Sequence, residues 1–170
     1  AHIRAQGDDP AEVVARFERE LAAFLKVDDP RRVVTTNSCT SALELALHLS
    51  NVAGGRVVTT PMTFVATTTA IYRAGARPLW ADVLPGSCQV DEACVDMLAA
   101  GAEAVVAVAW AGYSPRLDAL AATARRCRMP LVLDAAQALG AEFGGDPIHR
   151  WADFTCYSFA PTKHVTTADG

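Results

Sequence analysis

Short apolar runs rich in valine recur along this chain, and segments with helical spacing lie between them. The runs are continuous rather than alternating, which is typical of strands whose two faces are both covered. Six segments are predicted as strands: 32–36, 56–60, 78–83, 104–109, 131–134 and 154–157. Because strand and helix candidates alternate, the sequence predicts an α/β fold, a three-layer sandwich with a mostly parallel central sheet.

The helix candidates carry recognisable start signals. Asp9 is predicted to cap the first helix, with Pro10 at its first position, where a proline N–H is not needed. Four further segments have helical character, and Ser114 is predicted to cap the last of them: 41–50, 65–74, 92–99 and 115–126.

Composition excludes several classes of function. The chain has 170 residues and a net charge of −4, and it carries no basic face or tail of the kind that binds nucleic acid. No apolar run is long enough to span a bilayer. The five cysteines form no CxxC pair, and the histidines show no metal-ligand spacing. The sequence therefore predicts a cytoplasmic protein with free thiols and without a metal, nucleic-acid or membrane partner.

The last segment, 158–170, has the composition of an irregular polar loop rather than a closing helix. We therefore expect residues 1–170 to form a single, incomplete domain. A further C-terminal segment or a companion chain is expected to complete it.

The start of the second predicted helix is rich in small and hydroxyl residues. Ligands of parallel α/β sheets bind beyond the carboxyl ends of the strands, and backbone N–H groups at a helix start favour anions. In the segment 37–43, Thr40 and Ser41 are candidates for hydrogen bonds to a phosphate. The alternative is an ordinary helix cap.

A carboxylate ends the apolar run 131–134, and an amide follows three residues later. Asp134 would remain ionised beside a buried cation such as a protonated pyridine nitrogen, whose proton makes the ring an electron sink. Gln137 would reach the neighbouring ring oxygen. The alternative is that Asp134 only caps a helix.

The final loop contains Ser158 and Lys163. A lysine amine that is neutral can attack an aldehyde to form an imine and then move a substrate proton. Ser158 would bind phosphate. The alternative for Lys163 is a solvated surface charge.

An aromatic residue follows another strand candidate. Phe64, in the segment 61–67, is a candidate to stack on a flat heteroaromatic ring. The alternative is a core aromatic.

Four segments in this order resemble the DegT/DnrJ/EryC1/StrS family: NSCTSALELAL, PMTFVATTTAIYRAGARPLWADV, LVLDAAQALGA and SFAPTKHVTTADG. The likeness runs from about Phe17 to Gly170. Members of that family are fold-type-I enzymes that use pyridoxal 5′-phosphate, and most are aminotransferases in sugar or antibiotic biosynthesis. The resemblance implies that residues 1–170 are the N-terminal part of the large, cofactor-binding domain, without the small C-terminal domain.

The resemblance also implies roles for single residues. Lys163 matches the Schiff-base lysine, and Asp134 matches the partner of the pyridine nitrogen; these two are the implied catalytic residues. The other implied cofactor contacts are the phosphate ligands, the ring-stacking residue and the partner of the ring oxygen: Thr40, Ser41, Ser158, Phe64 and Gln137.

What the resemblance implies about activity is the transfer of an amino group from glutamate or glutamine. The acceptor would be a nucleotide-linked keto-sugar or a keto-cyclitol, in a homodimer with shared active sites. Two alternatives remain open. One is a related sugar dehydratase or lyase, although family dehydratases replace the lysine by histidine and here Lys163 precedes His164. The other is a non-catalytic half-domain that needs a companion chain.

The chain departs from the family pattern at Ala109, at Asp169-Gly170, where the family usually has Glu before a Gly pair, and in its length. Where family members often carry a histidine, in a V-H-x-x-G stretch, this sequence has Ala109. Family chains are also much longer than 170 residues. The longer part supplies the small domain and the residues that reach the partner subunit's cofactor.

Overall fold

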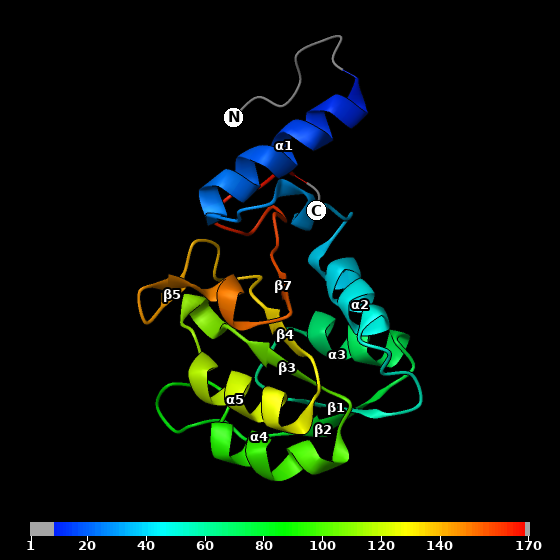
Figure 1. The fold of residues 1–170 in the computed structure, drawn as a ribbon, viewed down its shortest axis with the longest axis vertical. Helices are drawn as coiled ribbons and strands as arrows, with labels where there is room; N and C mark the ends of the chain where they lie inside the picture. Colours follow the sequence, from blue (N-terminus) through cyan, green and yellow to red (C-terminus); the bar gives the residue numbers. More distant parts are fainter. Residues whose placement is uncertain (1–8, 169–170) are drawn as a thin grey trace. The chain divides into compact units, whose positions relative to one another are not determined.

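The computed structural model describes residues 9–168 of the chain (Figure 1). These residues form two compact units that divide between Thr36 and Asn37. The first unit contains one long helix, and the second contains a five-stranded sheet with helices on both faces. All the residues predicted to contact a cofactor belong to the second unit.

In the first unit, helix α1 (Pro10–Leu25) begins as predicted. The side chain of Asp9 accepts a hydrogen bond from the backbone N–H of Ala11 (3.1 Å), and Pro10 occupies the first helical position. The helix ends at Lys26, which adopts a left-handed conformation with a φ of 58°.

The predicted strand at 32–36 is wrong. A 3₁₀ turn (Pro30–Arg32) is followed by irregular backbone. The backbone N–H and the hydroxyl of Thr35 both donate to the carboxylate of Glu18, at 2.8 and 2.9 Å. A side chain has thus taken the place that a neighbouring strand would hold, and it overrides the β propensity of this valine- and threonine-rich segment.

The sheet of the second unit has five parallel strands in the order β2-β1-β3-β4-β7. Their bounds are β1 (Arg56–Thr59), β2 (Arg77–Trp80), β3 (Ala104–Val108), β4 (Leu131–Asp134) and β7 (Phe154–Cys156). The predicted parallel sheet is confirmed. Each strand lies inside its predicted segment, except that β2 begins at Arg77 rather than Pro78.

Helices cover both faces of this sheet (Figure 1). Their bounds are α2 (Cys39–Leu49), α3 (Val65–Arg73), α4 (Glu92–Leu98) and α5 (Leu117–Cys127). In β1, Val57 packs with residues of α2 and α3, whereas its neighbour Val58 packs with residues of α4 and α5. Both valines are fully buried. This two-sided burial explains the continuous apolar runs, and it confirms the three-layer architecture.

The predicted cap of α5 is wrong. The Ser114 hydroxyl donates to the carbonyl of Pro115 (3.0 Å), so it does not reach the first turn. The helix begins after Arg116, which makes no capping hydrogen bond and instead pairs with Asp118 at 2.9 Å.

A short antiparallel pair, β5 (Glu142–Phe143) and β6 (Asp146–Pro147), was not predicted. Gly144 and Gly145 connect the two strands with φ values of 63° and 87°, which glycine adopts without strain. No helix among residues 9–168 has both the length and the apolar character needed to cross a bilayer. In the same range, no three His, Cys, Asp or Glu side chains gather as a metal site.

The strand order places a reversal between β1 and β3. The chain passes from β1 to β2 on one side and then returns to form β3 on the other side of β1. Loops that follow parallel strands diverge at such a point and leave room for a ligand. The loops after β1, β3, β4 and β7 contain Phe64, Ala111, Gln137 and Lys163, respectively.

Candidate functional site

Asp134 is the last residue of β4, and its side chain is buried, with 5% of the residue exposed. Its Oδ2 accepts a hydrogen bond from Thr67 Oγ1 (2.6 Å), and its Oδ1 accepts one from the backbone N–H of Ala136 (3.1 Å). Burial raises the pKa of Asp134, whereas these two hydrogen bonds and the charge of Lys163 lower it. The carboxylate is therefore held by donors that favour its ionised form, and a cation placed against it would complete an ion pair.

The backbone fixes the direction of this side chain. Asp134 is aligned with Val108 of β3 on one side and with Cys156 of β7 on the other. Its carbonyl accepts from Ala109 N (2.9 Å). After β4 the chain makes a turn rather than a helix, so the alternative in which Asp134 caps a helix is wrong.

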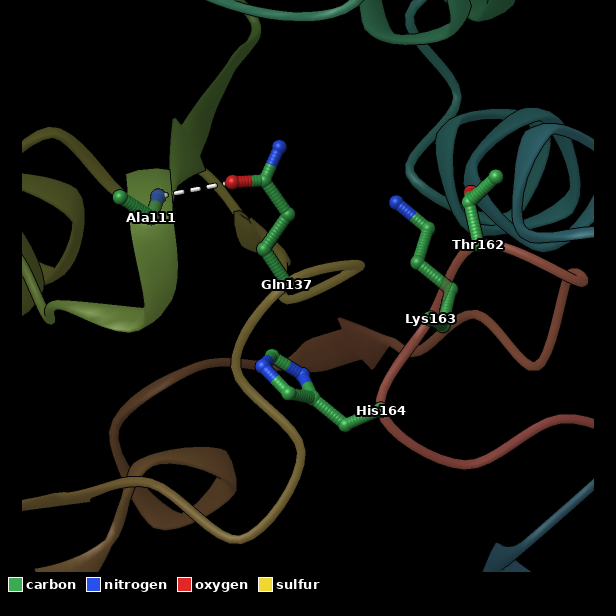
Figure 2. Close-up of a pocket in the computed structure, with 5 residues that line it drawn as sticks. All are labelled: Ala111, Gln137, Thr162, Lys163 and His164. Carbon is green, nitrogen blue, oxygen red and sulfur yellow. Dashed lines mark hydrogen bonds between the residues drawn. The ribbon is translucent and has the colours of Figure 1, made fainter.

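A cavity of about 350 Å³ opens at this edge of the sheet (Figure 2). Residues from the loops after β3, β4 and β7 line it: Ala111, Gln137, Thr162, Lys163 and His164. This volume is typical of small-molecule sites. In Figure 2 the side chains of Gln137 and Lys163 rise from opposite sides of the cavity, and His164 extends from the same loop as Lys163.

Gln137 is oriented by the turn after β3. Its Oε1 accepts from Ala111 N (2.8 Å), where Ala111 has a φ of 55°. Gly112 has a φ of 85°, and a Cβ there would lie 3.2 Å from the carbonyl of Gln137. Because Oε1 is engaged, the NH₂ group of Gln137 is presented to the cavity as a donor (Figure 2).

Lys163 is half-buried: it is less exposed than a fully solvated surface lysine and more exposed than a core residue. Its amine makes no hydrogen bond or ion pair with another residue in the part of the chain that the structure describes. Its charge nevertheless lies close enough to Asp134 and Cys39 to lower the pKa of both. The fold therefore brings Lys163 and Asp134 into one region, although they leave the sheet on different strands.

Thr40 and Ser41 lie in the first turn of α2, which begins at Cys39 rather than at the predicted Ser41. Ser38 is the cap: its Oγ accepts from Ser41 N (3.2 Å) and lies 3.0 Å from Ser41 Oγ. The pKa of Cys39 is raised chiefly by burial, then by the charges of Asp134 and Cys156. This first turn therefore lies near Asp134.

Of the predicted cofactor contacts, Gln137 and Lys163 line the cavity, and the others lie outside its lining residues: Thr40, Ser41, Phe64, Asp134 and Ser158. Ser158 is buried, and its Oγ accepts a long hydrogen bond from Ala160 N (3.4 Å). Phe64 directly precedes α3 and is 68% exposed. The alternative in which Phe64 is a core aromatic is therefore wrong, and its side chain is available to contact a ligand.

Sequence reasoning missed two contacts of this site. Thr67 holds Asp134, and the backbone N–H of Ala111 holds Gln137. The only signal for Thr67 was its place in the threonine-rich start of a helix. Ala111 carried a clearer one, since it precedes a glycine directly after a strand.

The sequence of this chain is similar to those of known proteins. The model of the DegT/DnrJ/EryC1/StrS aminotransferase family matches residues 6–170. A UDP-4-amino-4,6-dideoxy-N-acetyl-beta-L-altrosamine transaminase of Campylobacter jejuni is 34% identical over 92% of this chain and 42% of its own length. The chain spans about two fifths of the length of the curated relatives it matches.

Solved structures agree with this likeness. The sugar aminotransferase CalS13 from Micromonospora echinospora is 34% identical with a TM-score of 0.85, over 95% of this chain and 45% of that one. The PLP form of the Streptococcus pneumoniae protein Spr1654 is 28% identical with a TM-score of 0.83, over 92% of this chain and 44% of that one.

Proposed function

Since the chain belongs to the DegT/DnrJ/EryC1/StrS aminotransferase family, we propose that it is the cofactor-binding region of a pyridoxal-phosphate-dependent sugar aminotransferase. One observation carries this proposal. The buried carboxylate of Asp134 and the amine of Lys163 lie in one region, where burial raises the pKa of Asp134 and the charge of Lys163 offsets part of that rise.

The polar groups of the site fit the chemistry of this cofactor. The carboxylate of Asp134, with one donor on each oxygen, suits a protonated pyridine nitrogen. The NH₂ group of Gln137 suits the neighbouring ring oxygen, which is an acceptor. The first turn of α2, with Thr40 and Ser41, supplies N–H and hydroxyl donors for a phosphate, and Ser158 supplies another hydroxyl.

Two residues carry the proposed chemistry. When bound, pyridoxal phosphate supplies an aldehyde that condenses with amines and a protonated ring that accepts electrons. Asp134 would hold the proton of the ring nitrogen, because an ionised carboxylate at the end of β4 would pair with that cation. With the cofactor bound, Lys163 Nζ would hold it at rest and, once freed by the amino donor, would act as the base that takes the proton from the donor's α-carbon.

The other residues orient and cover the ring. Gln137 would hold one edge of the ring through its NH₂ group, and Phe64 would cover a face of the ring with its exposed aromatic side chain. In the second half of the cycle the same groups act in reverse on the acceptor. Donor and acceptor thus use one site in turn.

The substrates proposed are glutamate or glutamine as donor and a nucleotide-linked keto-sugar as acceptor, with a keto-cyclitol as the second acceptor class. The donor is supported by the family resemblance. The sugar is supported by the Campylobacter transaminase, which is named for a UDP-linked amino sugar. A homodimer with shared sites, completed by a C-terminal region, is part of the same proposal.

The test uses an unusual feature of the sequence, which contains two lysines, Lys26 and Lys163. Borohydride reduction of the cofactor-loaded protein fixes the cofactor to the lysine that holds it. We expect mass spectrometry of the peptides to place the adduct on Lys163. We also expect that Lys163→Ala removes the adduct and the amino transfer from glutamate.

Lys26→Asn is the matched control, because asparagine tolerates the left-handed backbone at this position. This variant should keep the adduct and the activity. An adduct on Lys26, or bound cofactor with no adduct, would contradict the role of Lys163. A loaded wild-type protein that never converts its cofactor with any amino donor would instead favour the non-catalytic half-domain.

A further inference from the structure

Two threonine hydroxyls are linked in a row to the carboxylate of Asp134. Thr63 Oγ1 lies 2.7 Å from Thr67 Oγ1, and Thr67 Oγ1 lies 2.6 Å from Asp134 Oδ2. Thr67 is completely buried, and Asp134 is nearly so. The row joins the start of α3 to the end of β4, two elements that are distant in the sequence.

The number of hydrogens and the charge of Asp134 together set the direction of this row. A threonine hydroxyl has a single hydrogen. When Thr67 donates it to an ionised Asp134, its contact with Thr63 requires Thr63 to be the donor. The row then runs from Thr63 to Thr67 to Asp134. A protonated Asp134 could instead donate to Thr67 and reverse the row, so the direction of the row depends on the charge of the carboxylate.

We propose that Thr67, supported by Thr63, is a positioning residue that holds Asp134 ionised and aimed at the ring nitrogen of the cofactor. The inference rests on the proposed function, because it concerns the same carboxylate. Thr67 does not touch the reacting atoms. It acts by donating to Oδ2 while Ala136 N donates to Oδ1, so that each carboxylate oxygen has one fixed donor.

The position of Thr67 on α3 adds a second effect. Its backbone N–H donates to the carbonyl of Phe64 (3.2 Å), which joins the first turn of this helix to the residue that precedes it. A single element thus presents the proposed stacking ring and the donor that orients Asp134. A shift of α3 would move Phe64 and Thr67 together. The proposed contact to the ring face and the proposed support of Asp134 would therefore change together.

Among the described residues, three ionisable groups interact with the carboxylate of Asp134. They are Cys39 of α2, Cys156 of β7 and Lys163. Burial raises the pKa of Cys156 to about 12 and that of Cys39 as well, so both thiols stay neutral near pH 7. The hydrogen bond from Thr67 is the main influence that lowers the pKa of Asp134 against the effect of burial.

The test reads the proton on the cofactor directly, by NMR of the holoprotein loaded with pyridoxal phosphate labelled with ¹⁵N in the ring. In Thr67→Val, the proton shared by the ring and Asp134 should move toward the carboxylate, by roughly tenfold in the equilibrium between the two forms. The ring resonance should shift toward that of a neutral pyridine. Thr67→Ser keeps the hydroxyl and should restore the wild-type resonance.

Thr123→Val is the matched control, because Thr123 also donates a buried hydroxyl to a carboxylate, that of Asp96 (2.6 Å), on α4 rather than at the site. It should leave the ring resonance unchanged. If Thr67→Val does not load the cofactor, Thr63→Val is measured in its place. We expect its ring resonance to shift in the same direction by a smaller amount. A wild-type resonance in a loaded Thr67→Val protein would overturn the inference and leave the proposed function intact. A wild-type protein that binds no cofactor would overturn both.

Discussion

The end of β4 and the loop that follows β7 meet at one site, yet they are built very differently. Asp134 lies between two strands, accepts two hydrogen bonds on its carboxylate and is almost fully buried. Lys163 lies on irregular backbone, where Lys163 N donates to Ala160 O (2.9 Å). The neighbouring side chains of His164 and Val165 are exposed.

The contrast matches the two proposed roles. A carboxylate that keeps a proton on a ring must hold one position and one charge, so fixed donors and burial serve it well. A lysine that holds a cofactor, is freed from it and then moves a proton must change partners during each cycle. It therefore gains from a backbone with few fixed contacts, the kind of segment that opens locally at low free-energy cost.

The largest effect is expected from Asp134→Asn, which keeps the shape of the side chain but removes its charge. If the fixed acid maintains the ring proton, amino transfer should slow by about 10³-fold, which is about 4 kcal/mol in the barrier. Borohydride trapping on Lys163 should persist, because the amine is untouched. Single-turnover kinetics with glutamate measure the loss. A variant with near-normal turnover would remove Asp134 from its proposed role.

The next effect concerns stability and compares the same two regions. Leu133 of β4 is fully buried in the cluster that packs against α4 and α5. Leu133→Ala should lower the free energy of unfolding by about 3 kcal/mol, through lost burial and the cavity left behind. Val165 on the final loop is 51% exposed, so Val165→Ala should change the free energy of unfolding by less than about 0.5 kcal/mol.

Urea titration of the apoprotein measures both variants. Similar losses at the two positions would mean that the final loop is as firmly packed as the sheet, and the contrast between the regions would fail. A loss at Leu133 below about 1 kcal/mol would mean that the layer of α4 and α5 can close over the missing side chain.

The sheet was predictable because its strands carry their own signal. β4 was located to the residue, since a strand covered on both faces is a continuous apolar run bounded by polar residues. The segment 32–36 has a similar composition but is not a strand, because Glu18 satisfies the backbone and side chain of Thr35. Composition indicates which segments can extend, but not which partner their N–H groups will find.

The site was predictable only in part, for the same reason. Asp134 ends a strand, and Gln137 and Lys163 follow strands, so the rule that ligands bind at the carboxyl ends made all three candidates. Thr67 could not be found in this way. Its role depends on a hydrogen bond to a residue 67 positions away, and a buried threonine in a helix looks like any other until that contact is known.

The smallest effect is a pH dependence that also tests how Asp134 is held. An aspartate in an unfolded chain titrates near pH 4. Burial raises the pKa of Asp134 in the folded protein, and the bonds from Thr67 and Ala136 offset only part of that rise. The unfolded state therefore releases this proton first as the pH increases. The contribution of Asp134 to stability is fully present below about pH 4 and is lost as the pH rises through its folded pKa.

Asp134→Asn has no such proton, so it serves as the reference. The free energy of unfolding of the wild-type apoprotein minus that of Asp134→Asn should fall as the pH rises above about 4. The fall should be larger when Thr67→Val replaces the wild type, because losing the hydrogen bond from Thr67 raises the pKa of Asp134 further. A difference that increases with pH would mean that the hydrogen bonds outweigh burial and that the carboxylate is ionised even at acid pH. In that case the fold alone would keep the carboxylate of Asp134 ionised, before any cofactor binds.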